Sequence, residues 1–202
     1  MIAKEWRSDR GQTLPIYIWM TGILLFVAFA FFAFAQAASA RNGAQSAADA
    51  AALAAAQESR DELVEGLGLA IGDGDEWLDW LNGDNIDGAG AQGAADALAA
   101  DNDAHVTGFG PDEVNGFPGY TVEIETNYTV GDSIIPGTET THATAEATAI
   151  IKPRCEAAPS SDPEKAVEFD CEDGGSFEID PEDFDLDDLP DASVLFAVHL
   201  AD

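Results

Sequence analysis

Residues 14–35 form an apolar run without a single charged side chain, and no other feature constrains the fold of this chain as strongly. An α-helix needs about 20 such residues to cross the hydrocarbon core of a bilayer. Lys4, Arg7 and Arg10 precede the run, whereas only Arg41 follows it closely. Because basic residues concentrate on the cytoplasmic side of a span, we expect a single-pass cell-membrane protein with a cytoplasmic N-terminus and an extracellular C-terminal domain.

The small residues "AQAASA" at positions 35–40 leave a second interpretation open. They resemble the cleavage site that follows the apolar core of a secretory signal, which would release the protein after Ala40. The apolar run is, however, longer than the roughly 7 to 15 residues of a typical signal core. We therefore expect a membrane anchor and keep the released protein as an alternative.

The helical pattern continues beyond the apolar run. Residues 37–65 contain no proline and one glycine, and most of them are strong helix formers. The sequence therefore predicts one helix from about Pro15 to about Glu65. At ~1.5 Å per residue this helix would be ~75 Å long, so its second part would project beyond the bilayer.

Small residues line one side of this projecting part. Gly43, Ala47, Ala51 and Ala55 recur every four residues, with Ala48 beside them. Small side chains let another backbone approach closely, so we take these five as candidate helix-packing residues. The partner stays open between sister helices and the chain's own sheet, and helix propensity alone also explains so many alanines.

The charge balance restricts the partners. The chain has 39 acidic against 8 basic residues, a formal net charge of −31. Such a surface repels phosphate backbones and anionic headgroups, which excludes nucleic acid as an expected partner. It is typical of a well-solvated extracellular surface and also suits cations or a basic ligand.

The central part of the chain mixes short helices and strands. Helices are predicted in "DEWLDWLNG", with Asp75 as a candidate cap, and over residues 93–101. Alternating apolar and polar residues predict strands over residues 120–130 and 143–149 that pair as a hairpin, with a third strand at 105–109. The inner face of the second strand is entirely alanine, which leaves room for the long helix.

The last part of the chain is acidic. Residues 156–191 combine many carboxylates with four prolines, so we expect an extended or partly disordered segment, followed by a final strand in "SVLFAVHLA". Cys155 and Cys171 begin this part, and in an extracellular setting a disulfide between them would contribute about 3 kcal/mol. Two free thiols are the alternative.

Taken together, these patterns predict an α+β fold in which a long N-terminal transmembrane and alanine-rich helix packs on a small antiparallel sheet, with an acidic irregular C-terminal segment. The expected divisions are a basic cytoplasmic leader (1–13), the transmembrane helix (14–35), its extracellular continuation (36–65), a small α+β domain (66–154) and the acidic disulfide-loop segment with the final strand (155–202).

Residues 9–57 carry a resemblance to a known family. The stretch "DRGQTLPIYIWMTGILLFVAFAFFAFAQAASARNGAQSAADAAALAAAQ" resembles the N-terminal module of Tad/Flp pilus-assembly proteins of the TadE/TadG type. These proteins combine a basic leader, an Arg-Gly pair, an apolar helix and a signature close to "QxAADAAALAAA". The chain is similar above all to short actinobacterial TadG-related members.

The resemblance implies a pilin-like fold and pilus or secretion-system subunits as partners, including copies of the chain itself. Pilin-like members are cut after a glycine, which makes Gly11 and Gln12 the candidate processing site. Such members carry a glutamate at the fifth position after the cut, where this chain has Ile16. Longer TadG-like proteins carry a metal-binding DxSxS motif, of which only "DAS" at positions 191–193 is present here.

No motif of a common enzyme class is present. The sequence lacks a P-loop, GxSxG and HExxH, so we expect no enzyme. The acidic clusters at 72–76 and 180–188 do not follow EF-hand spacing, so no cofactor is expected, with calcium as the alternative. The leading hypothesis is a non-enzymatic pilus-assembly protein that acts through packing of its N-terminal helix. The alternative is a secreted or membrane-anchored acidic module that binds cations or a basic ligand through residues 156–191.

Overall fold

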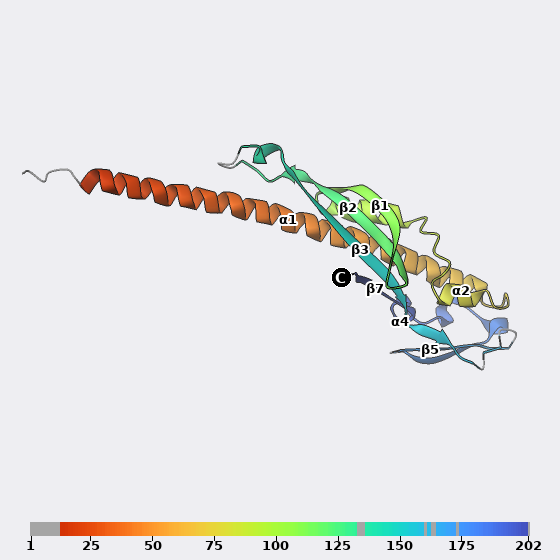
Figure 1. Cartoon of the computed structure of the whole chain (residues 1–202). Coiled ribbons are helices and arrows are strands. Elements are labelled where there is room, and N and C mark those ends of the chain that lie inside the picture. Colours follow the sequence, from red (N-terminus) through yellow and green to blue (C-terminus); the bar gives the residue numbers. More distant parts are fainter. Residues whose placement is uncertain (1–12, 133–135, 160, 163–164, 173, 202) are drawn as a thin grey trace, which may run out of the picture.

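The computed structural model describes residues 13–132, 136–159, 161–162, 165–172 and 174–201. A single helix, α1 (Thr13–Ala70), forms the axis of the molecule. Figure 1 shows that its first half, residues 13–39, projects from the rest, whereas its second half, residues 40–70, carries the other described elements. The expected unbroken rod is therefore present.

The remaining elements follow one another along the second half of α1. They are α2 (Trp77–Leu81), α3 (Ala91–Asp101), β1 (Ala104–Val114), β2 (Phe117–Thr129), η1 (Thr138–Thr140), β3 (His142–Pro153), β4 (Cys155–Ala157), β5 (Val167–Cys171), β6 (Gly175–Ile179), η2 (Pro181–Asp183), η3 (Leu186–Asp188), α4 (Ala192–Leu195) and β7 (Phe196–Leu200). The two predicted short helices and the predicted hairpin, which is β2 and β3, are all present.

The main sheet has four antiparallel strands in the order β1-β2-β3-β7. Val122 and Ile124 of β2 and Ala147 and Ala149 of β3 are buried toward α1, whereas Glu146 faces solvent. This alternation is the one that the sequence predicts. The alanine face of β3 keeps the sheet close to the helix, because it places little side-chain volume between the two backbones.

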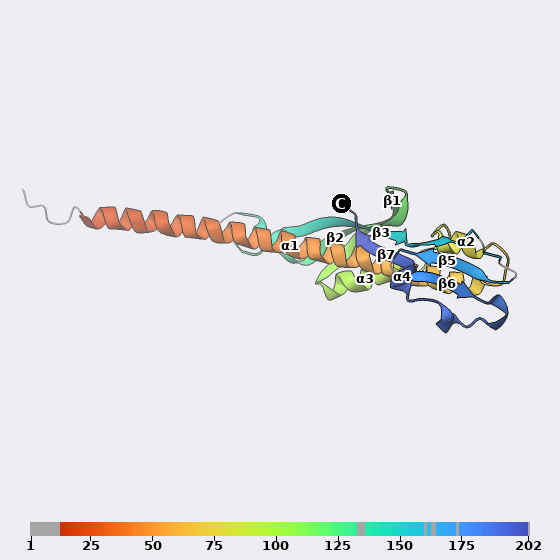
Figure 2. The ribbon, with the colours of Figure 1, turned by 90° about the horizontal axis from the view of Figure 1, so that it is seen from below.

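The final strand brings the chain back to this sheet. β7 pairs with the end of β3, with Ile151 opposite Val198. The predicted strand "SVLFAVHLA" is shorter than expected, because its first residues form the turn of α4. Figure 2 shows α3 and β7 beside the second half of α1, so that helices and strands surround this half.

The acidic segment is more regular than predicted. Instead of an extended or disordered stretch, it contains a second antiparallel sheet, in the order β4-β5-β6. Val167, Phe169 and Ile179 are buried, and the Phe169 and Phe177 rings stack with centroids 5.4 Å apart. These few apolar side chains, together with the disulfide described below, hold the three strands in place. The composition of the segment alone does not indicate these strands.

Two further expectations were wrong in detail. α1 continues past Glu65 to Ala70, and Gly66 leaves the space that the Trp80 ring occupies, since a side chain at this position would collide with the ring. Asp75 does not cap α2; the capping position is Glu76, and no side chain bonds there. The predicted α+β class, with a long apolar helix and antiparallel sheets, is confirmed.

Candidate functional site

The first half of α1 exposes large apolar side chains along its length. Trp19, Phe31 and Phe34 are each 73% exposed, and Leu24 is 64% exposed. Soluble monomers rarely show such a continuous apolar surface. This helix is long and apolar enough to cross a membrane, with a mean hydropathy of 2.3 over its most apolar window. Within the described residues it is the one candidate span.

The main sheet begins where the apolar run ends. The β2–β3 hairpin reaches along α1 toward its first half (Figure 1), and a Cβ built on Gly131 would lie 3.5 Å from Gln36 Nε2. Ala33 is already covered, at 4% exposure. The folded domain therefore starts within about one turn of the last apolar residues, and α1 passes through the "AQAASA" stretch without a break.

The predicted helix-packing residues lie inside the protein's own core. Ala47, Ala48, Ala51 and Ala55 have no exposed surface. Gly43 is half-buried, and the hydroxyl of Tyr128 occupies the space that a side chain at Gly43 would need. α1 contacts β2, β3 and α3 along this side. Of the two partners that the sequence left open, the structure thus places the chain's own sheet against these residues.

The row of small residues continues into a polar contact that the sequence did not single out. Ser59 follows Ala55 at the same four-residue spacing and is fully buried. Its hydroxyl lies 2.9 Å from the hydroxyl of Tyr120 on β2. Burial raises the pKa of Tyr120 above the ordinary tyrosine value, and the nearby carboxylates of Glu62 and Asp87 raise it further, although the bond to Ser59 opposes this shift. The four-residue spacing of the small residues could have identified Ser59 from the sequence as a member of the buried side.

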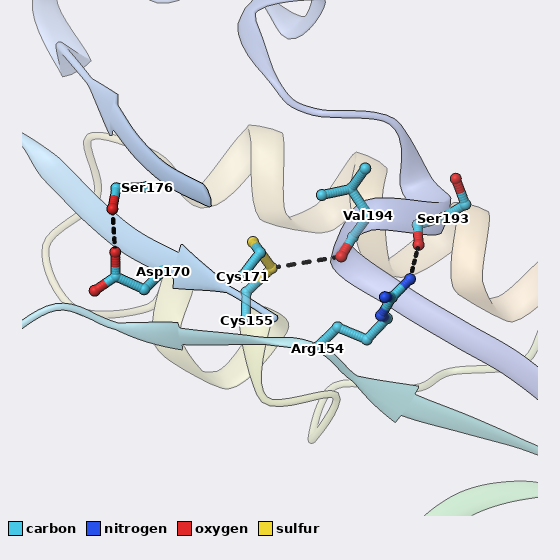
Figure 3. Close-up of a disulfide and its surroundings, with 7 residues drawn as sticks. All are labelled: Arg154, Cys155, Asp170, Cys171, Ser176, Ser193 and Val194. Atoms are coloured by element: carbon cyan, nitrogen blue, oxygen red, sulfur yellow. Dashed lines mark hydrogen bonds between the residues drawn. A yellow bond between two sulfur atoms is a disulfide. The ribbon is translucent and has the colours of Figure 1, made fainter. Parts of the chain in front are cut away.

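The cysteines form a disulfide, as the sequence predicts for an extracellular setting. Cys155 and Cys171 are opposite one another on β4 and β5 (Figure 3). Beside them, Arg154 Nη1 donates to the Ser193 carbonyl oxygen at 2.9 Å, which links the second sheet to α4. The disulfide thus joins two strands of the second sheet, and the Arg154 bond holds the start of that sheet against α4.

Several carboxylates of the acidic segment accept bonds from the chain itself. Asp180 and Asp185 cap η2 and η3, and Asp170 accepts a hydrogen bond from Ser176. In the part of the chain that the structure describes, no group of three or more His, Cys, Asp or Glu side chains is arranged to hold a metal ion. The expectation of no cofactor is untested, and calcium at the two acidic clusters and a ligand site at residues 156–191 stay alternatives.

The candidate processing site at Gly11 and Gln12 lies outside the described residues, as do the basic residues of the leader.

The comparison with known families concerns the same helix. Residues 11–58 match the family described as "Putative Flp pilus-assembly TadE/G-like". The N-terminal segment is TadE/G-like. The resemblance drawn from the sequence is thereby confirmed over these residues. No curated protein and no solved structure was found to match the chain.

The TadE/G-like segment includes the whole first half of α1 and ends at Glu58, within the second half. It contains all five predicted helix-packing residues, but neither of the two sheets. The family match therefore describes the apolar half and most of the alanine-rich side, and the sheets have to be interpreted from their own geometry.

Proposed function

We propose that this protein is a single-pass envelope protein that acts without catalysis in the assembly of a Tad/Flp-type pilus. In this proposal the N-terminus is cytoplasmic and the two-sheet domain lies outside. The observation that supports this proposal most directly is that the TadE/G-like match falls on a helix whose first half is largely bare and apolar and whose second half packs its small-residue side against the sheet.

The proposed contacts with other subunits lie within the membrane. Because β2, β3 and α3 cover the small-residue side of the second half, a sister helix cannot reach Ala47 or Ala51 without displacing the sheet. In the first half, residues 13–29 have no such cover. Helices in lipid associate through close packing at small residues rather than through a hydrophobic driving force.

One place on the first half has the shape for such packing. A shallow cavity of about 380 Å³ lies at Gly22, between Ile18, Trp19 and Phe26. A Cβ built on Gly22 would meet no atom within 4 Å, so the hollow is open to a side chain of a neighbouring helix. In this proposal, contact at Gly22 joins the chain to pilus subunits or to a second copy, and the rigid rod displays the domain.

Site-specific photocrosslinking in intact cells tests this function. A photoreactive side chain at Phe26, which lines the hollow at Gly22, is expected to give adducts with other pilus-assembly subunits or with a second copy. The same group at Leu69, 69% exposed but in the packed half, serves as the control. Deletion of the gene is expected to abolish pili, and complementation to restore them. Recovery of the protein free of the membrane, together with normal pili in the deletion strain, would contradict the proposal.

A further inference from the structure

The hairpin of β2 and β3 follows α1 toward its apolar half, as Figure 1 shows. The hydroxyl of Tyr128 occupies the space beside Gly43, and farther along the hairpin Gly131 adjoins the side chain of Gln36. Gln36 is the first residue after the apolar run. The end of the hairpin therefore lies level with the end of that run.

The cover on α1 continues into the apolar run itself. Ala30 is half-buried and Ala33 is only 4% exposed, although residues 13–29 are all exposed. Ala33 precedes the buried Ala40 by about two helical turns, so both lie on the side of α1 that carries the sheet. Protein thus covers one side of α1 within the last turns of the apolar run.

Two exposed phenylalanines indicate where the membrane surface crosses α1. Phe31 and Phe34 belong to the same turns as the covered alanines and are each 73% exposed. Residues 14–35 measure ~33 Å at ~1.5 Å per residue, which matches the ~30 Å hydrocarbon core of a bilayer. A span that stopped at residue 29 would measure only ~24 Å and would leave both rings in water. The hydrocarbon core of a spanned bilayer therefore extends to about Ala35, and the covered alanines lie below its surface.

We propose that the hairpin end, residues 130–132 and 136–141, rests in the headgroup layer of the bilayer that α1 spans. This second membrane contact depends on the span of the proposed function, and it adds a fixed orientation of the domain. The headgroup layer is roughly 5–7 Å thick on each side of the hydrocarbon core. Because Gly131 lies beside Gln36, directly above the hydrocarbon boundary, the hairpin end cannot avoid this layer.

The charges of the hairpin end match this depth. Asp132 and Glu139 are its charged residues, and both are exposed. The described residues between them, 136–138, carry no charge. Ionised carboxylates are costly in hydrocarbon, so these two remain among the hydrated headgroups and limit how deep the hairpin end can sink.

The lipid that fits the hairpin end is zwitterionic. The chain has a formal net charge of −31, so a surface of anionic headgroups repels it. A choline or ethanolamine headgroup instead presents a positive group, which can pair with the carboxylates of Asp132 and Glu139. Phosphatidylcholine is therefore the lipid with which the contact is tested.

Electron paramagnetic resonance of a nitroxide label measures the depth of the hairpin end. The full chain, with its disulfide intact, is held at one copy per phosphatidylcholine nanodisc. Single labels are attached in Pro136→Cys and Thr140→Cys, and the matched control is Pro111→Cys, at an exposed proline of β1 whose partner Tyr120 contacts Ser59 far along α1. Leu24→Cys reports the span itself.

The expected result is a graded protection from a water-soluble nickel chelate. Its collisions with the label should be several-fold rarer at Pro136→Cys than at Pro111→Cys, with Thr140→Cys between them. Collisions with oxygen, which concentrates in lipid, should follow the reverse order.

A charge variant tests what limits the depth. Asp132→Asn/Glu139→Gln removes both carboxylates of the hairpin end and should lower the nickel collisions at the Pro136→Cys label further. The matched control, Asp112→Asn/Glu113→Gln, removes the same charges from two exposed positions of β1 and should leave those collisions unchanged.

Three results would overturn the membrane contact, and they differ in what they leave standing. If the Pro136→Cys label is as open to nickel as Pro111→Cys while Leu24→Cys is protected, the domain stands clear of the bilayer that α1 still spans. If the Pro136→Cys label is shielded from both nickel and oxygen, protein covers the hairpin end instead of lipid. If Leu24→Cys is also open to nickel, α1 does not span the bilayer, and the proposed function fails as well.

Discussion

The first and second halves of α1 are continuous in backbone but differ in the size and surroundings of their side chains. Residues 13–39 carry Trp, Phe, Leu and Ile, which are exposed, and residues 40–70 carry chiefly Ala and Gly on the side that is buried. In a soluble helix large apolar residues are buried and small ones are found anywhere. Here the large side chains are exposed and the small ones are buried, which indicates that the two halves of α1 lie in different surroundings.

The two environments explain the two compositions. In the first half lipid would cover the large side chains, so their size adds apolar contact without requiring a partner surface. In the second half the sheet lies so close that Ala51 and Ala55 have no exposed surface. There a side chain larger than alanine has no space, because β3 also presents alanine.

The largest expected effect comes from comparing a charged side chain introduced into the first half of α1 with the same side chain introduced into the second half. Leu24 and Leu69 are similarly exposed, at 64% and 69%, but we expect Leu24 to face lipid and Leu69 to face water. Leu24→Arg should cost about 3 kcal/mol of membrane insertion, the scale for arginine near the centre of a span. Leu69→Arg should leave insertion unchanged.

Glycosylation mapping of the inserted fraction measures both variants. Thermal unfolding of the domain provides the control, because neither substitution touches its core. If both variants insert equally well, the first half is not a membrane span and the comparison fails.

Loss of the disulfide should give the next largest effect, and it distinguishes the second sheet, which contains the bond, from the main sheet, which covers the second half of α1. Cys155→Ala/Cys171→Ala should lower the free energy of unfolding of the second sheet by about 3 kcal/mol, the value for a loop of this length. The packing of α1 against β2 and β3 does not depend on this bond. Hydrogen exchange should therefore rise in β4–β6 and stay low in β2 and β3; equal loss of protection in both sheets would show that they unfold as one unit.

A smaller effect is expected from an increase in side-chain volume on α1. Ala51→Leu forces a larger side chain into a closed contact and should destabilise the domain by about 1–3 kcal/mol. Ala28→Leu makes the same change in the exposed half and should leave the domain unaffected. Denaturant unfolding in nanodiscs compares the two. If Ala51→Leu left the stability of the domain unchanged, the sheet would have to separate easily from the helix. The second half would then be available to a sister helix.

These pairs also show what could be predicted from the sequence. The continuity of α1 follows from local propensity, because no proline interrupts it, and the β2–β3 hairpin follows from strict alternation in both strands. The stripe of small residues alone left the partner open between a sister helix and the sheet, and the all-alanine face of β3 supplied the argument for the sheet. The identity of the partner depends on how β3 lies across α1.

The other differences have the same origin in distant contacts. α1 extends beyond Gly66 because Trp80 packs there, and nothing near Gly66 in the sequence indicates this. The second sheet rests on strands of three to five residues, held by the pairing of Cys155 with Cys171 and by two stacked phenylalanines.

The smallest expected effect concerns the buried polar contact between Ser59 and Tyr120 in the second half. Tyr120→Phe removes the partner of the buried Ser59 hydroxyl and should cost about 1 kcal/mol at neutral pH. The pH dependence gives a sharper test. Burial raises the pKa of Tyr120 in the folded protein above its unfolded value of about 10.

Because the folded state holds this proton more tightly than the unfolded state, the contribution of Tyr120 to stability is complete below about pH 10 and is lost as the pH rises through the raised folded pKa. Tyr120→Phe should therefore lose less stability than the unmodified protein above that pH, so that the two unfolding curves converge. Tyr128→Phe, at a tyrosine that is 40% exposed, is the control and should leave the slope unchanged. Parallel curves for Tyr120→Phe and the unmodified protein would mean that water reaches Tyr120, and the second half would then be less tightly covered than its alanines indicate.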